Sequence, residues 1–153
     1  MTLGATAPGL PRRVLLTGAS RGIGNAIARA LLREGVRLAV VGRDREALAV
    51  LLGDAPGHAL LEVDLARTNE VEACVDRAAE LLGGIDAFVA CAGIAEHAAV
   101  GAISADMLAR QFDVNFTAPF LMAQRAARPI AAAGGGSILL IASSLGIKPA
   151  PQT

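Results

Sequence analysis

The stretch Thr17-Gly18-Ala19-Ser20-Arg21-Gly22-Ile23-Gly24 decides the fold of this chain. It follows a short apolar run and opens a segment whose apolar residues recur at helical spacing. Glycines at these points allow a tight turn and a close approach of the backbone to a phosphate, and the start of the next helix carries partial positive charge. A strand, a glycine-rich turn and a helix in this order predict a site for the pyrophosphate of a dinucleotide.

The rest of the chain repeats the alternation of strand and helix. Apolar runs without polar alternation are typical of strands buried on both faces of a parallel sheet. Such runs occupy 14–17, 36–41, 59–63, 85–91 and 137–142, and helical spacing occupies 22–33, 45–52, 68–82 and 104–133. We expect Thr68 to cap the third helix, Ser104 to cap the fourth, and Pro119 to kink or break the fourth.

This pattern predicts an α/β fold, a Rossmann-type doubly wound parallel sheet of five strands in the order 3-2-1-4-5. Residues 1–11 contain glycine and proline without an apolar period, so we expect a flexible leader before a NAD(P)-binding Rossmann domain at 12–153.

Composition excludes several classes of function. Because 54% of the 153 residues are hydrophobic, the chain is not disordered, and its formal net charge of zero removes the electrostatic case for nucleic acid. No signal peptide is evident, and glycines and serines interrupt the uncharged stretch 129–147, so we expect a cytoplasmic protein that does not enter membranes. Cys74 and Cys91 lack metal or redox spacing, so no metal site is expected.

The turn has the spacing Gly-x-x-x-Gly-x-Gly with Thr17 in front, and in this it resembles the short-chain dehydrogenase/reductase (SDR) family. The resemblance extends from residue 12 to residue 153. Further stretches that carry it are Asp64-Leu65, Ala90-Cys91-Ala92-Gly93, Asp113-Val114-Asn115 and Ser143-Ser144-Leu145-Gly146.

The resemblance implies a set of site residues. Those implied to contact the cofactor are Thr17, Gly18, Ser20, Arg21, Gly22, Ile23, Gly24, Arg43, Asp64, Leu65, Cys91, Ala92 and Gly93. In catalysis, Ser143 is implied to hydrogen-bond the carbonyl oxygen of the substrate, and Asn115 to anchor a water of a proton relay. Ser143 matches better than Ser144 because it lies three residues before Gly146.

The end of the second strand addresses which nicotinamide cofactor is bound. In the family an acidic residue there favours NAD, but here Gly42 is followed by Arg43. A guanidinium binds a 2′-phosphate through charge-assisted hydrogen bonds, and Arg21 is a second cation within the glycine turn. Asp44 is the counter-argument, since a shift of one residue would bring a carboxylate to the ribose. We therefore expect NADP(H) rather than NAD(H).

The family's acid–base pair, a Tyr with a Lys four residues later, has no counterpart here. The chain contains no tyrosine, and its single lysine, Lys148, follows Ser143 by five residues. The sequence therefore predicts an NADP(H)-dependent oxidoreductase of the short-chain type, acting on a small carbonyl or alcohol, present as a fragment without catalysis of its own. A non-catalytic NADP(H)-binding or interaction module is the alternative, and homo-oligomerisation is left open. A Rossmann-like methyltransferase would need an acidic residue where Gly42 stands.

Overall fold

A computed structural model describes residues 9, 11–99 and 101–148, so most of the predicted leader at 1–11 lies outside the described residues. One sheet contains five parallel strands in the order β3-β2-β1-β4-β5, which confirms the predicted fold class and strand order. The strands are β1 (Arg13–Thr17), β2 (Arg37–Gly42), β3 (Ala59–Glu62), β4 (Ala87–Ala90) and β5 (Ser137–Leu140).

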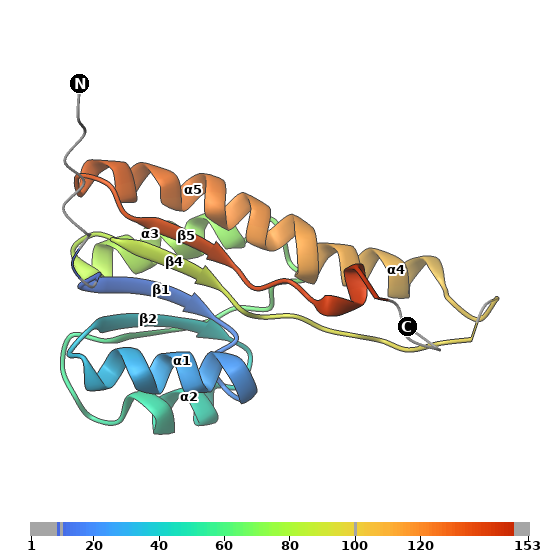
Figure 1. Ribbon diagram of the computed structural model, residues 1–153, viewed down its shortest axis with the longest axis horizontal. Coiled ribbons are helices and arrows are strands. Elements are labelled where there is room, and N and C mark those ends of the chain that lie inside the picture. The colour runs from blue at the N-terminus through green and yellow to red at the C-terminus, as the bar shows by residue number, and fades with distance from the viewer. Residues whose placement is uncertain (1–8, 10, 100, 149–153) are drawn as a thin grey trace.

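Helices cover both faces of the sheet. Those on one face are α1 (Gly22–Arg33) and α2 (Arg45–Leu52), and those on the other are α3 (Val71–Leu82) and α5 (Ala118–Ala132), as Figure 1 shows. The α4 helix (Ala105–Phe112) precedes α5, and a short 3-10 helix, η2 (Ser144–Gly146), follows β5.

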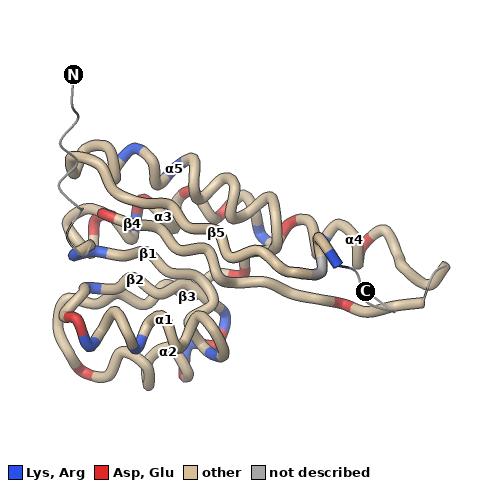
Figure 2. Tube along the Cα trace, viewed as in Figure 1, with Lys and Arg blue, Asp and Glu red and all other residues tan. Residues whose placement is uncertain are grey.

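The central strands are buried on both faces, which explains their unbroken apolar runs. Leu15 and Val41 belong to the core beneath α3 and α5, whereas Leu16 and Val40 belong to the core beneath α1 and α2. All four side chains are fully buried. Where these strands carry charge, it lies at a strand end, as at Arg37 and Glu62, so charged groups gather on helices and connections (Figure 2).

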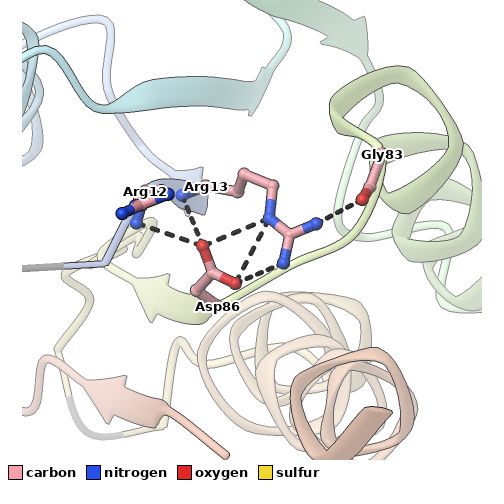
Figure 3. Close-up of polar contacts among 4 residues, drawn as sticks. All are labelled: Arg12, Arg13, Gly83 and Asp86. Carbon is pink, nitrogen blue, oxygen red and sulfur yellow. Dashed lines mark hydrogen bonds and ion pairs between the residues drawn. The ribbon is translucent and has the colours of Figure 1, made fainter. Parts of the chain in front are cut away.

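The starts of β1 and β4 are joined by a carboxylate (Figure 3). Asp86 accepts hydrogen bonds from the backbone N–H of Arg12 at 3.1 Å and of Arg13 at 2.9 Å, and from Nε of Arg13 at 3.2 Å. The Arg13 guanidinium also donates to the carbonyl of Gly83. The hydrogen bond from Arg13 holds the pKa of Asp86 below its usual range and raises the pKa of Arg13. The pair therefore fixes the two strands against each other at the end of the sheet remote from the glycine turn.

The long helix predicted over 104–133 is divided in three. Ser104 caps α4 as expected, its Oγ accepting from the N–H of Met107 at 3.1 Å. A π-helical segment, η1 (Asp113–Thr117), then joins α4 to α5, and Pro119 lies in the first turn of α5. A proline is tolerated there because the first turn does not need its missing N–H. The expected kink or break is therefore a change from α- to π-helical bonding that keeps the chain helical.

The predicted start of the third helix was wrong. Thr68 does not cap α3, which begins at Val71 with Glu70 at its N-cap. The preceding residues form a separate turn, closed by the N–H of Glu70 donating to the carbonyl of Arg67 at 2.9 Å.

The strands β3, β4 and β5 also end one or two residues before their predicted ends, where the chain turns away toward the cleft described below. In the described part of the chain no helix has the length and apolarity needed to cross a membrane.

Candidate functional site

A cleft of about 700 Å³ opens at the carboxyl ends of β1 and β4. The chain leaves β1 toward one face of the sheet and β4 toward the other, so these ends flank the topological switch point where ligands bind in doubly wound sheets. Of the residues implied by the resemblance, all except Thr17 line this cleft. The structure thus brings together the glycine turn, the ends of β2 and β3, the segment after β4, η1 and the segment after β5.

The glycines of the turn are required for two different reasons. A Cβ on Gly18 would lie 2.6 Å from the backbone nitrogen of Ala92, and a Cβ on Gly24 would lie 2.1 Å from the carbonyl oxygen of Gly18. Gly22 has open space around it but a φ of +55°, which residues with a side chain rarely adopt. The turn therefore combines close backbone packing with a left-handed residue, and it leaves a surface free of side chains.

The start of α1 faces this surface. Arg21 is its N-cap and provides no side-chain cap, and the first turn of α1 holds no acidic residue. Nδ2 of Asn25 donates to the carbonyl of Ala19 at 3.0 Å and so fixes the turn from within the helix. The partial positive charge of the helix end is thus directed at the cleft without a competing carboxylate from its own first turn.

Thr17 supports the cleft from behind. It is buried, and its Oγ1 accepts hydrogen bonds from the backbone N–H of Cys91 and of Ala92, each at 3.2 Å. It therefore ties the end of β1 to the segment that follows β4. Burial raises the pKa of the Cys91 thiol, so this cleft residue stays protonated at neutral pH.

The part of the cleft beside the glycine turn and the end of β2, which we call its far end, carries cations. Arg21 and Arg43 are both exposed there. Oδ1 of Asp44 accepts from the backbone N–H of Ala47 at 2.9 Å and caps α2, and Asp44 does not line the cleft. Next to this end, Oδ1 of Asp64 accepts from the N–H of Ala66 at 3.1 Å, while the side chain of Leu65 packs into the core.

The opposite wall holds Asn115 and Ser143. The Asn115 carboxamide pairs with the backbone of Ile94 in both directions, accepting at Oδ1 and donating from Nδ2, each at 2.9 Å. In an α-helix the Asn115 carbonyl would bond the N–H four residues on, but Pro119 has none. Ser143 lies beyond the last residue of β5, so the alternation of a strand does not decide between it and Ser144; Ser143 lines the cleft and Ser144 begins η2.

Sequence reasoning missed Arg110 and Gln111. Arg110 lines the cleft and pairs with Glu96, Nε to Oε1, at 3.3 Å. Gln111 contacts the backbone of Glu96. Neither belongs to the stretches that carry the resemblance; the spacing of Gln111 and Asn115, one helical turn apart, is the sequence feature that could have drawn attention to them. Within the described ranges, no three His, Cys, Asp or Glu residues are grouped to hold a metal ion.

A parallel doubly wound sheet with a glycine turn at its switch point defines a Rossmann-type nucleotide-binding fold. The chain matches the family model described as short chain dehydrogenase over residues 12–153, and it belongs to the short-chain dehydrogenase/reductase family, whose cofactors are NAD and NADP.

Individual relatives agree with this membership. The chain is 38% identical to D-threitol dehydrogenase of Mycolicibacterium smegmatis over 84% of this chain and 51% of that protein. It is 31% identical to a human 3-oxoacyl-[acyl-carrier-protein] reductase over 86% of this chain and 56% of that one. The chain thus spans about half the length of the curated relatives it matches.

Solved structures are similar as well. A short-chain dehydrogenase of Burkholderia cenocepacia in complex with NADP superposes with a TM-score of 0.84 at 31% identity, covering 92% of this chain and 59% of that one. A short-chain dehydrogenase/reductase of Brucella melitensis gives a TM-score of 0.83 at 29% identity, covering 93% and 60%.

Proposed function

We propose that the cleft binds NADP(H) and that the protein is an oxidoreductase that exchanges hydride between the nicotinamide and a small carbonyl or alcohol substrate. One observation carries the choice of NADP(H): Arg21 and Arg43 flank the far end of the cleft, while the carboxylate of Asp44 caps α2. The two guanidinium groups suit a 2′-phosphate, and the acidic group that would repel it is directed into a helix cap.

The remaining residues of the cleft fit the rest of the dinucleotide. The side-chain-free surface at Gly18, Gly22 and Gly24, together with the start of α1, suits the pyrophosphate. We assign the adenine end to Asp64 and Leu65, which line the cleft after β3, the strand that pairs with β2. A similar structure, the Burkholderia cenocepacia short-chain dehydrogenase, is in complex with NADP, which supports the same assignment.

At the nicotinamide end, two residues take part in the reaction. When bound, NADP(H) supplies or accepts the hydride. The Ser143 hydroxyl donates a hydrogen bond to the carbonyl oxygen of the substrate, where negative charge develops. Asn115 keeps its carboxamide on Ile94, and the family resemblance assigns it the anchoring of a water in a proton relay.

A second candidate is an NADP(H)-binding module that does not turn the cofactor over. The 153 residues include no tyrosine, the residue that the resemblance makes the proton donor. Mixing the chain with NADPH and a panel of small aldehydes and ketones separates the candidates, because the oxidoreductase consumes NADPH absorbance and the module only binds.

The choice of cofactor is tested with Arg43→Ala. A hydrogen bond to a charged group contributes about 1.5–3 kcal/mol, so we expect the dissociation constant for NADPH to rise about tenfold or more while that for NADH stays unchanged. Arg33→Ala is the matched control, since it removes an exposed arginine at the end of α1 remote from the cleft. An unchanged ratio of NADPH to NADH affinity in Arg43→Ala would remove Arg43 from the site.

A further inference from the structure

Two carboxamides on the helical side of the cleft bind one extended segment. Asn115 bonds the N–H and the carbonyl of Ile94. Gln111 repeats the arrangement at Glu96, accepting from its N–H at Oε1 at 3.3 Å and donating from Nε2 to its carbonyl at 3.4 Å. The segment that contains Ile94 and Glu96 lies outside the sheet. Each carboxamide pairs with its backbone as a residue of a neighbouring strand would.

The two carboxamides on the helical side are spaced to meet two residues on the same side of an extended segment. Gln111 lies in α4 and Asn115 in η1, about one helical turn further along, and two residues rise about 6.6 Å along an extended segment. Gln111 and Asn115 are four residues apart, and their partners Ile94 and Glu96 are two residues apart. A slip of this segment by one residue would therefore break both pairs together, so the two carboxamides fix its register.

The segment held in this way is a wall of the cleft. Cys91, Ala92, Gly93 and Ile94 all line it. Its beginning is held by Oγ1 of Thr17, and its far end is held by Asn115 and Gln111.

A third contact acts at the same place. Glu96 pairs through its carboxylate with Arg110, the neighbour of Gln111 and a residue of the cleft. Both side chains of this pair are more than a third exposed, so the ion pair adds little to stability. The backbone pairing by Gln111 restrains Glu96 in addition to this ion pair.

We propose that Gln111 is a positioning residue that sets the nicotinamide half of the cleft by fixing the segment 91–96. This role rests on the proposed function, which assigns Asn115, the partner of Ile94, to the nicotinamide end and Arg21 and Arg43 to the adenosine 2′-phosphate. Gln111 acts through the backbone of Glu96 and makes no contact with the cofactor itself.

The test compares a whole dinucleotide with its adenosine half. We would measure dissociation constants of NADPH and of adenosine 2′,5′-bisphosphate by calorimetry for the wild type and for Gln111→Leu. Losing the pairing at Glu96 should weaken NADPH binding about fivefold, the effect of one typical hydrogen bond. It should leave the bisphosphate unaffected, because this ligand lacks the nicotinamide half that would lie beside Ile94 and Asn115. Gln124→Leu, an exposed glutamine on α5, is the matched control and should change neither constant.

Every result of this test either supports or overturns the inference. Equal weakening of both ligands by Gln111→Leu would mean a general loss of structure, and no weakening of NADPH would mean that Gln111 positions nothing; either overturns the inference. A wild type that binds neither ligand would instead refute the proposed function, and the inference with it.

A second pair of variants covers the case in which Gln111→Leu does not fold. Glu96→Pro and Glu96→Ala both remove the carboxylate that pairs with Arg110, but only the proline also removes the N–H that donates to Gln111. The proline variant alone should lose NADPH affinity while keeping the bisphosphate. Equal affinities for NADPH in the two variants would contradict the inference.

Discussion

The strands β1 and β5 have similar sequences and very different surroundings. Both are short apolar runs, yet Leu15 and Leu16 in β1 are fully buried, while Leu139 and Leu140 in β5 are 50% and 53% exposed. β1 has strands on both sides and helices over both faces, whereas in the described residues β5 pairs with β4 alone and packs against α5 (Figure 1). An apolar run thus shows that a strand forms, and only its neighbours determine how much burial it gains.

The sharpest test of this comparison is truncation of one leucine in each strand. Leu16→Ala should lower the free energy of unfolding by about 3 kcal/mol, because it leaves a cavity in a filled core. Leu139→Ala should cost about 1 kcal/mol, because half of its surface already meets solvent. Urea unfolding followed by circular dichroism measures both, and equal losses would show that β5 is covered in solution.

The glycine turn beside β1 allows a second, smaller contrast within one segment. Gly24→Ala should cost about 2–3 kcal/mol, since its Cβ would overlap the carbonyl of Gly18 and the backbone must move. Gly22→Ala has room and should cost only the left-handed conformation, about 1 kcal/mol. Thermal unfolding of both variants checks the order, and a larger loss for Gly22→Ala would mean that close packing does not dominate the turn.

The carboxylates Asp86 and Asp76 provide the third contrast. Asp86→Asn should cost about 2 kcal/mol near neutral pH, because it leaves the half-buried Arg13 without a charged partner. Asp76→Asn breaks a bidentate pair with Arg125, but both groups are more exposed, so we expect about 0.5 kcal/mol.

The pH dependence follows from the lowered pKa of Asp86. The stabilisation is complete above the unfolded-state pKa, near 3.9, and is lost as the pH falls through the lower folded-state value. Asp86→Asn should therefore flatten this part of the acid unfolding curve measured by fluorescence of an added apolar dye. A curve as steep as that of the wild type below pH 4 would assign acid sensitivity to other carboxylates.

The features that sequence predicted well are those set by backbone constraints. Gly18 and Gly24 are required wherever two backbones meet this closely, so their spacing predicted the turn, and the apolar runs predicted the sheet and its order. The π-helical segment η1 could not be predicted, because Pro119 indicates a disturbance without specifying the bonding that absorbs it.

Contacts between side chains and the backbone could not be predicted from the sequence either. Thr68 had the residue type of a cap but lies before a separate turn, so α3 starts later. Gln111 has no motif around it, and its partner Glu96 is 15 residues away in irregular chain. Asp44 was ambiguous in sequence, and only its bond to Ala47 shows that it caps α2.

The hydrogen bonds from Cys91 and Ala92 to Thr17 have a consequence for how the molecule assembles. They close loops of 74 and 75 residues, whereas β1 and β2 are joined through α1 alone. Long loops close slowly because more chain entropy is lost before any contact is gained. We therefore expect β1, α1 and β2 to organise early and the β1–β4 junction late. The cleft would then be completed only as folding ends.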